Sequence, residues 1–255
     1  MKFRLVLLGT GTSQGVPVIG CDCVVCQSND PKDNRLRTSA LVKTKSGNIL
    51  IDIGPDFRTQ MLKSKNNSIH SILLTHQHRD HTAGLDDIRP IYYLNKKPID
   101  LYAEDHVCKA IKSDFNYLFD DNEYPGKPKI NVSIINDKPF DILNTSITPI
   151  RVMHHKLPVL GYRIGGMSYI TDANYISLDE KKKIIGSKIL ILNSLQRKPH
   201  VSHYNLEQSL ALIEELKPEK AYLTHISHEM GMHDSLTQEL PKNVFLAYDN
   251  LEISF

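Results

Sequence analysis

The chain has 255 residues, 40% of them hydrophobic and 24% charged, which is enough to bury a sizeable core. Its formal net charge of +2 argues against a broad basic face for long nucleic acid, although a small phosphorylated substrate remains compatible with it. No apolar run has the length that spans a membrane, and the run at residues 5–8 is too short for a signal peptide. We therefore expect a cytoplasmic protein without membrane contact. Residues 120–126 have the composition of a polar loop, not of a linker, so we expect one domain over residues 1–255.

The first predicted elements are a strand at residues 2–8 and the glycine-rich loop at residues 9–15. Loops of this kind can bind phosphate through backbone N–H groups, but this one has neither a P-loop lysine nor the spacing of a dinucleotide-binding motif. A flexible turn is an equal alternative.

Three of the four cysteines, Cys21, Cys23 and Cys26, lie close together in the sequence. In a reducing compartment this spacing favours thiolate metal ligands over disulfides. Three thiolates leave a tetrahedral zinc one ligand short, so a structural zinc requires a fourth ligand from elsewhere. Idle thiols or a disulfide are the alternative. The fourth cysteine, Cys108, is expected to pack in the core.

Strands at residues 40–44 and 48–53 are predicted to form a hairpin, and a helix follows at residues 56–65. Asp52 ends the second strand, where its carboxylate can accept a hydrogen bond from a metal-binding histidine and fix the tautomer of that ring. The alternative is an aspartate that only shapes the turn before the helix.

The densest group of metal-binding side chains follows a buried strand predicted at residues 71–75. This group is His76, His78, Asp80 and His81, and imidazole and carboxylate are ligands of divalent transition metals. In an extended chain His76 and His78 point the same way, so both can bind one ion. A helix predicted at residues 82–87 places Asp80 and His81 on the bend before it, where they can bind a neighbouring ion. The alternative is a solvated histidine-rich loop.

The middle of the chain places further imidazole and carboxylate groups at strand ends. We predict a strand at residues 99–103, a helix at 105–118, and strands at 130–135, 140–143 and 146–152. The last of these strands leads into His154 and His155, either of which can be a ligand or a polar cap. A hairpin of strands at residues 161–164 and 167–171 ends in Asp172.

The last part of the chain contains a predicted helix at residues 177–185, a buried strand at 188–192 and a helix at 206–216. The last helix carries a capping signature, and His200 and His203 stand just before it. A strand at residues 221–224 leads into His225 and His228, which echoes the earlier Thr-His motif and suggests two related halves meeting at one site. Strands at residues 244–247 and 251–255 are predicted to form a closing hairpin.

These motifs resemble the metallo-β-lactamase superfamily of dinuclear metal hydrolases. The resemblance rests on His76-Gln77-His78-Arg79-Asp80-His81, followed by a single histidine, a single aspartate and a late histidine at strand ends. It covers essentially the whole chain. It implies an α/β fold of the αββα sandwich type, with two mixed β-sheets flanked by helices and metals at the strand ends between the sheets.

Within the superfamily, the chain is similar to the PhnP family of phosphoribosyl cyclic phosphate phosphodiesterases. This resemblance rests on the glycine-rich loop, on Gln14-Gly15-Val16-Pro17, on the cysteine cluster and on the sequence of residues 223–228. It implies that one ion is held by His76, His78 and His154, that a second is held by Asp80, His81 and His225, and that Asp172 bridges the two.

The PhnP resemblance implies further roles. His228 would complete a structural zinc site with Cys21, Cys23 and Cys26, and His203 would act in catalysis together with Asp80. The spacing to Lys156-Leu157 favours His154 as the ligand, whereas counting back from Gly161-Tyr162 favours His155.

The implied function is a dinuclear-metal-dependent hydrolase of a small cyclic phosphodiester, such as a phosphoribosyl cyclic phosphate. Two manganese, zinc or iron ions about 3.5 to 4 Å apart would lower the pKa of a shared water to about 7, and the bridging hydroxide would attack phosphorus. His203 would donate a proton to the departing alkoxide or stabilise the crowded phosphorus. The alternative for His203 is a helix cap or a core histidine.

Three other functions are compatible with the metal motif. A tRNA-processing nuclease shares the motif but needs an extended basic arm, which this sequence lacks. An acyl or thioester hydrolase is a second alternative, since a metal hydroxide also attacks carbonyl carbon. An inactive metal-binding module is the third, and it ranks low because every expected ligand is present. We expect a small phosphorylated substrate as partner, and the sequence allows a homodimer through loops around residues 35–39.

Overall fold

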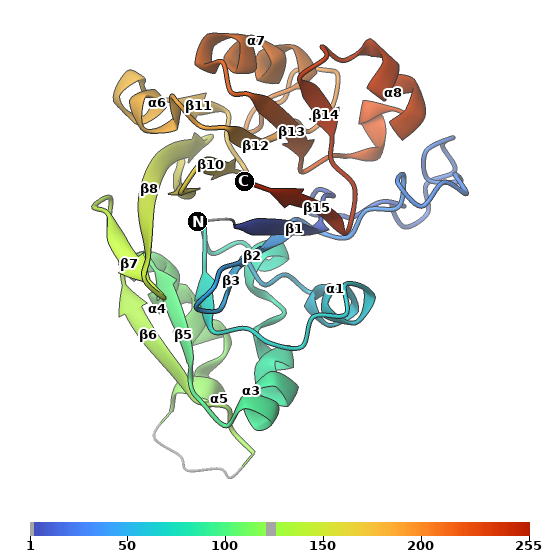
Figure 1. Ribbon diagram of the computed structural model, residues 1–255. Coiled ribbons are helices and arrows are strands. Elements are labelled where there is room, and N and C mark those ends of the chain that lie inside the picture. Colours follow the sequence, from blue (N-terminus) through green and yellow to red (C-terminus); the bar gives the residue numbers. More distant parts are fainter. Residues whose placement is uncertain (1–2, 121–125) are drawn as a thin grey trace.

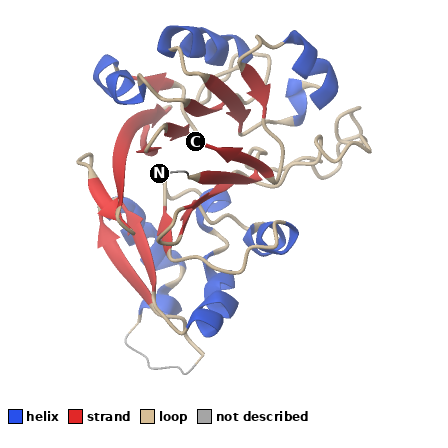
Figure 2. Cartoon of the chain, viewed as in Figure 1, coloured by secondary structure: helices blue, strands red, loops and turns tan. Residues whose placement is uncertain are grey.

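The computed structural model describes residues 3–120 and 126–255. Two β-sheets pack face to face, and helices cover the outer face of each sheet (Figure 1, Figure 2). This arrangement confirms the predicted αββα sandwich with two mixed sheets. The polar loop predicted at residues 120–126 lies for the most part outside the described residues.

The first sheet has the strand order β15-β1-β2-β3-β4-β5-β6. Its strands are β1 (Arg4–Gly9), β2 (Ser39–Lys43), β3 (Asn48–Ile51), β4 (Ser71–Leu73), β5 (Ile99–Ala103), β6 (Ile130–Ile134) and β15 (Leu251–Ser254). The helices of this half are α1 (Phe57–Lys63), α2 (Arg79–Thr82), the 3-10 helix η1 (Leu85–Ile88), α3 (Arg89–Asn95), α4 (Asp105–Asp114) and α5 (Asn116–Phe119). Strands β3 to β6 run parallel, so their carboxyl ends lie at one edge of the sheet.

The second sheet has the strand order β11-β8-β9-β10-β12-β13-β14, and β7 pairs with β8. Its strands are β7 (Phe140–Ile142), β8 (Thr145–His154), β9 (Leu157–Ile164), β10 (Met167–Ile170), β11 (Tyr175–Ile176), β12 (Ile189–Asn193), β13 (Lys220–Thr224) and β14 (Val244–Leu246). The helices of this half are α6 (Leu178–Ile184), α7 (Leu206–Leu216), the 3-10 helix η2 (His228–Met230) and α8 (His233–Glu239). Strands β10, β12, β13 and β14 are parallel.

Central strands of each sheet are buried on both faces, which explains their continuous apolar sequences. In β1, Leu5 and Leu7 pack between the two sheets, while Val6 and Leu8 pack under the helices of the first half. In the second half, Leu190 and Leu192 of β12 pack under its helices. The result is three apolar layers, and each fully buried side chain of this size contributes about 1.5 to 3 kcal/mol of transfer free energy.

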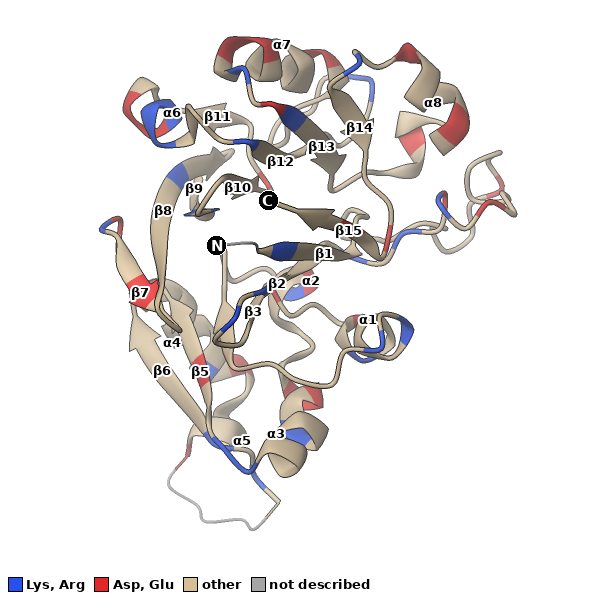
Figure 3. Ribbon diagram, in the orientation of Figure 1, with Lys and Arg blue, Asp and Glu red and all other residues tan. Residues whose placement is uncertain are grey.

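In helix α6, charged residues lie where the helix dipole favours them. Helix α6 begins with Asp179 and Glu180 and ends with three lysines, which suits the helix dipole, and Ser177 caps it by accepting a hydrogen bond from the backbone N–H of Glu180. Figure 3 shows basic and acidic residues interspersed over the ribbon. Within the described ranges no helix is long and apolar enough to cross a membrane.

The closing hairpin predicted at residues 244–255 is wrong. Strand β14 pairs with β13 in the second sheet, whereas β15 pairs with β1 in the first, so the two strands lie in different sheets. The turn between them is held by Asp249, whose carboxylate accepts hydrogen bonds from the N–H and hydroxyl of Thr10 at 2.9 and 2.8 Å. Local turn chemistry predicted the bend correctly but did not show that the chain crosses between the sheets.

Two further predictions need correction. The helix predicted at residues 82–87 is instead α2, which already begins at Arg79, followed by η1, so Asp80 and His81 lie in the first turn of a helix. The loop at residues 35–39, expected to be exposed, has Arg35, Thr38 and Ser39 buried within the chain, while the homodimer itself stays a prediction.

Candidate metal centre

The predicted metal-binding side chains come together where strands of both sheets end. His76 follows β4, His154 ends β8, Asp172 follows β10 and His225 follows β13. The two sheets are joined at this edge, because the hydroxyl of Tyr162 donates a hydrogen bond to the carbonyl of Leu74 at 2.5 Å. Residues far apart in the sequence therefore share one small volume.

The carboxylate of Asp172 lies at the centre of this volume. Three groups of potential ligand atoms each fall within 4.8 Å, and every group contains Asp172. The groups are His76, His81 and Asp172; His154, Asp172 and His203; and Asp80, Asp172 and His225. His78 lies beside them, with its ring centroid 4.5 Å from that of His76 and 5.3 Å from that of His154.

On three rings of the cluster, Nδ1 has a hydrogen-bond partner at 2.9 Å or closer. Nδ1 of His81 donates to Oδ2 of Asp52 at 2.7 Å, as the position of Asp52 had suggested. Nδ1 of His154 donates to the carbonyl of Ser202 at 2.9 Å, and Nδ1 of His76 lies 2.9 Å from the hydroxyl of Thr75. Such partners fix the tautomer and leave Nε2 free to bind a metal.

The free ring nitrogens are suited to a cation. Nε2 of His76 and Nε2 of His81 are buried and have no hydrogen-bond partner among the described residues. Nε2 of His81 instead lies 3.2 Å from carboxylate oxygens of both Asp80 and Asp172. A lone pair facing two carboxylates is unfavourable unless positive charge lies between them, and a divalent metal ion provides that charge.

The protonation states agree with this fit. Burial lowers the pKa of His76, His78 and His225, so these rings are neutral near pH 7 and can offer lone pairs. Burial alone would raise the pKa of Asp172, but His225 and His81 hold it well below its usual value. Burial also opposes protonation of His81, yet the surrounding carboxylates raise the pKa of His81 well above its usual value. Positive charge is therefore favoured at this position.

Several residues at these strand ends have a left-handed backbone. The φ angles are 61° at Asp52, 53° at Asp172 and 56° at His225. This region is uncommon for residues other than glycine and costs on the order of 1 to 3 kcal/mol at each position. The packed strands behind these residues maintain the conformation, which turns each side chain toward the common centre.

The structure separates the two adjacent histidines after β8. His154 is half-buried and faces His203, with ring centroids 4.5 Å apart, whereas His155 is exposed. The backbone N–H of His155 donates to Asn174. His154 therefore lies in the cluster and His155 does not.

His203 lies at the edge of the cluster, in the segment before α7. It is buried, and its Nδ1 lies 3.9 Å from Oδ1 of Asp172 and has no hydrogen-bond partner among the described residues. Burial, reinforced by His225, lowers the pKa of His203 to about 3. Its neighbour His200 is exposed. Asn205, not His203, caps α7, together with Gln208, so the helix-cap alternative for His203 does not hold.

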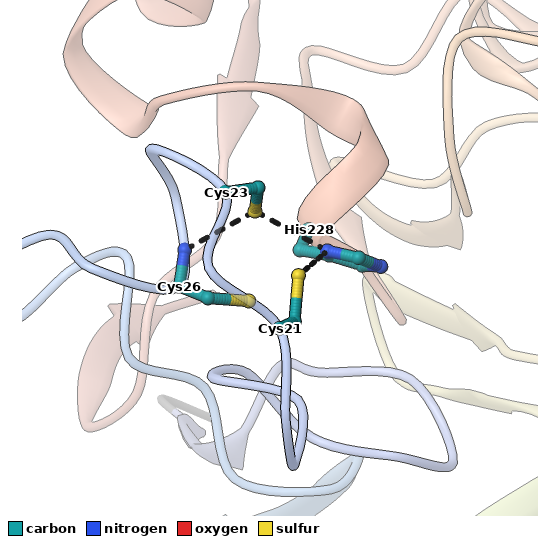
Figure 4. Close-up of side chains that lie close together, drawn as sticks. All are labelled: Cys21, Cys23, Cys26 and His228. Atoms are coloured by element: carbon teal, nitrogen blue, oxygen red, sulfur yellow. Dashed lines mark hydrogen bonds between the residues drawn. The ribbon is translucent and has the colours of Figure 1, made fainter.

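A second group of ligand atoms consists of Cys21, Cys23, Cys26 and His228, all within 4.8 Å of one another (Figure 4). Nδ1 of His228 lies 3.2 Å from Sγ of Cys21 and 3.3 Å from Sγ of Cys23. A tetrahedral zinc ion holds such atoms about 3.5 to 3.8 Å apart, as its bond lengths of about 2.3 Å to sulfur and 2.0 Å to nitrogen require. The four side chains thus have the composition of a closed zinc site, with His228 slightly closer to the two thiols than a bound ion would hold it.

Backbone N–H groups support thiolates in this cluster. The N–H of Val18 donates to Sγ of Cys26 at 3.3 Å, and the N–H of Cys26 donates to Sγ of Cys23 at 3.4 Å. The hydrogen bond from the Cys26 backbone, with His228, lowers the pKa of Cys23 to about 6, while burial raises that of Cys26 to about 11. A metal ion would favour the thiolate at both positions.

Comparison with known proteins identifies the family. A family model described as the beta-lactamase superfamily domain matches residues 47–226. The chain belongs to the metallo-β-lactamase superfamily. A solved structure described as a new diphosphatase from the PhnP family is 36% identical, covers 100% of this chain and 98% of its own, and superimposes with a TM-score of 0.94. The chain therefore also belongs to the PhnP family.

Two other relatives are informative. An octanoyltransferase of Porphyromonas gingivalis is 40% identical over 98% of this chain, but the match covers only 51% of that protein. The chain spans about half the length of the curated relatives it matches. Zinc-bound PqqB from Methylobacterium extorquens is 20% identical with a TM-score of 0.81, covering 98% of this chain and 99% of its own, and shows the same fold.

Some functional neighbours in this PhnP-family chain were not predicted. Ser202 and Thr75 support ring nitrogens, and Thr12 places its hydroxyl 3.4 Å from Nε2 of His225. Short polar residues of this kind carry no spacing signal that distinguishes them from ordinary loop residues. The glycine-rich loop is built as a turn, because the N–H groups of Gly11, Thr12 and Gly15 all bond to backbone carbonyls.

Proposed function

We propose that this chain is a metal-dependent phosphodiesterase that hydrolyses a small phosphodiester. The observation that supports this most directly is the position of Asp172, a carboxylate shared by three ligand groups and flanked by buried ring nitrogens without partners. A shared carboxylate is the usual bridge between two metal ions in enzymes that stabilise both the attacking and the leaving oxygen of a phosphoryl transfer.

The proposed ligands follow from the clusters. His76, His78 and His154 hold one ion, Asp80, His81 and His225 hold the other, and Asp172 bridges them. Manganese and zinc both suit this set of imidazole and carboxylate groups. When bound, such ions supply hydroxide near neutral pH and stabilise the charge that develops on phosphoryl oxygens.

The remaining residues orient this centre. Asp52 holds the ring of His81 through Nδ1, and the hydroxyl of Thr75 donates to the same carboxylate at 2.9 Å. His203, neutral at pH 7 because burial lowers its pKa to about 3, can donate an N–H hydrogen bond to a phosphoryl or departing oxygen. We propose that His203 stabilises the crowded phosphorus in this way.

We also propose that Cys21, Cys23, Cys26 and His228 hold a structural zinc ion. The site has four protein ligands and no position for a substrate, which distinguishes structural from catalytic zinc. Because His225 and His228 lie on one short segment, this zinc would also fix the loop that carries a ligand of the catalytic centre.

The name of one relative favours a second candidate. A protein called octanoyltransferase contains a segment that is 40% identical to this chain, although that segment is only 51% of its length. An acyl or thioester hydrolase is therefore the alternative, and the diphosphatase of the PhnP family adds a diphosphate bond as a third type of substrate.

A substrate panel tests the proposal. The protein loaded with manganese or zinc is assayed with bis-p-nitrophenyl phosphate, a small ribosyl cyclic phosphodiester, a nucleoside diphosphate, an octanoyl thioester and nitrocefin. We expect turnover of the phosphodiesters that is abolished by a chelator and restored by metal. Preferred hydrolysis of the thioester would replace the proposal with the acyl hydrolase.

A further inference from the structure

A cavity of about 360 Å³ lies between the proposed metal centre and the cysteine cluster. His203 lines it on the side of Asp172, and His228 lines it on the side of the cysteines. Thr12, which contacts His225, lines its buried end. A phosphodiester whose phosphorus lies at the metal centre can therefore place one of its two ester groups in this cavity.

The lining of the cavity is polar but contains no cationic side chain of lysine or arginine among the described residues. Gln14 and Gln196 offer amide groups, and Ser13 and Ser227 offer hydroxyls. Glu229 adds a carboxylate at the exposed rim, and this carboxylate forms no ion pair within the described part of the chain. These groups can exchange hydrogen bonds with hydroxyls of a ligand.

Two arginines that contact or adjoin lining residues do not change this balance. Arg37 donates to the backbone carbonyl of Ser13, and its guanidinium also bonds to both oxygens of Asp56 at 3.0 and 3.1 Å. Arg197, which follows Gln196, forms two hydrogen bonds with Glu239 at 2.9 and 2.8 Å. Both positive charges are therefore already paired with carboxylates.

We infer that this cavity binds an uncharged, hydroxyl-bearing ester group, and that Glu229 disfavours an ester group that carries a second phosphate. A phosphate dianion in a protein site is normally matched by Arg, Lys or several N–H donors. Here the lining offers N–H donors from amide and imidazole groups but no Lys or Arg, and the carboxylate of Glu229 adds a negative charge that a hydroxyl can donate to and a phosphate cannot. The inference rests on the proposed phosphodiesterase function and specifies its substrate, and it departs from the phosphate-bearing ribosyl group that the PhnP resemblance implies.

Two p-nitrophenyl phosphodiesters test the inference. In the first the other ester group is glycerol, and in the second it is glycerol that carries a phosphate on its far hydroxyl. Release of p-nitrophenolate is measured at pH 8, above the usual histidine pKa of about 6.5. We expect kcat/KM of the wild type to be about five- to tenfold higher for the glycerol diester, since a phosphate dianion several ångströms from a carboxylate in water-like surroundings is repelled by about this factor.

The variants Glu229→Gln and Glu229→Lys measure the contribution of the carboxylate. The ratio of the two kcat/KM values should fall about five- to tenfold in Glu229→Gln and further in Glu229→Lys. Glu219→Lys is the matched control, because Glu219 is also exposed but precedes β13 at the end opposite His225. This control should keep the wild-type ratio. Equal kcat/KM values in the wild type, or a ratio that Glu229→Lys leaves unchanged, would overturn the inference.

A binding measurement separates failure of the inference from failure of the proposed function. Calorimetry with the metal-loaded protein compares glycerol 3-phosphate with glycerol 1,3-bisphosphate. If no phosphodiester is turned over, the proposed function fails, and the ratio of these two dissociation constants decides the inference alone. The inference is supported if glycerol 3-phosphate binds more tightly than the bisphosphate and this preference weakens in Glu229→Lys. It is contradicted if the bisphosphate binds more tightly, or if neither binds more tightly than the other.

Discussion

Buried side chains around the metal centre differ in what each is expected to do, and His203 is the clearest case. It lies 3.9 Å from Asp172 but contributes no ligand to our proposed assignment. Replacing His203 with Ala should lower kcat about a hundredfold or more, because an oriented donor to the reacting phosphoryl group is lost. Metal content by elemental analysis should remain that of the wild type. Wild-type turnover in this variant would remove His203 from the mechanism.

Asp52 is expected to act on metal affinity. Its buried carboxylate accepts hydrogen bonds from the N–H of Thr75 at 2.8 Å, from the hydroxyl of Thr75 at 2.9 Å and from Nδ1 of His81 at 2.7 Å. Asp52→Asn keeps the shape but weakens the hold on the His81 ring, and we expect metal affinity to fall about 10- to 100-fold. Chelator competition measures this. An unchanged dissociation constant would show that His81 is positioned without Asp52.

Single residues of the centre were the part most accessible from the sequence. Histidines and aspartates directly after apolar strands carried the signal, and His76 to His81 form a dense run. The sequence does not decide between His154 and His155, because both adjoin the end of β8. Only the turn of the backbone determines which ring faces inward. The Ser202 carbonyl that supports His154 is a backbone atom that no sequence pattern marks, and the supporting hydroxyls of Thr12 and Thr75 carry no spacing signal.

The proposed zinc ion joins two elements of the fold. It binds Cys21, Cys23 and Cys26 of an N-terminal loop and His228 of η2. Cys23→Ser should lower the bound zinc by one equivalent and lower the melting temperature, since binding free energy at a structural site is also folding free energy.

The matched control for this variant is Cys108→Ser, in α4, where the buried thiol lies away from the cysteine cluster. It should leave the zinc stoichiometry unchanged. Unchanged zinc and melting temperature in Cys23→Ser would refute the structural site.

Helices and strands were predicted well where the hydrophobic pattern is local. The strand at residues 99–103 and the helix at 206–216 agree with β5 and α7. The helix predicted at residues 105–118 is interrupted at Phe115, whose φ of −123° ends α4 before α5 begins. Helices α3 and α8 and strand β11 were not predicted, because each is short and depends on tertiary contacts.

For the whole molecule, contact between the two sheets contributes to stability, and two buried tyrosines test this contribution. The hydroxyl of Tyr162 donates to Leu74, whereas the hydroxyl of Tyr169 has no partner among the described residues. Tyr162→Phe should lower the free energy of unfolding by about 1 to 3 kcal/mol. Tyr169→Phe, the matched control, should leave it unchanged or raise it. Denaturant titration measures both, and equal effects would contradict the assignment.

Stability should also depend on pH through Asp249, which joins the two sheets at the crossing of the chain. Burial raises the pKa of Asp249 from 3.8 to about 6. A raised carboxyl pKa means that the folded state binds the proton more tightly, so this contribution is full below about pH 4 and is lost as pH rises through about 6.

The variant Asp249→Asn isolates this contribution. Between about pH 4 and pH 6, the wild-type free energy of unfolding should fall by about 2 to 3 kcal/mol relative to that of Asp249→Asn, and the difference should be level above this window. Denaturant unfolding at several pH values provides the measurement. A difference that does not vary with pH would mean that Asp249 titrates alike in the folded and unfolded states.

The pairing of β15 with β1 has a consequence for how the protein matures during synthesis. Strand β15 pairs with β1, and His225 and His228 belong to ligand groups whose other members lie earlier in the sequence. Neither proposed metal site can be complete before these late histidines have been synthesised, even if the earlier strands have already paired. Contacts between such distant segments also slow folding. Metal that reaches the chain before His225 and His228 are made should therefore meet only incomplete sites.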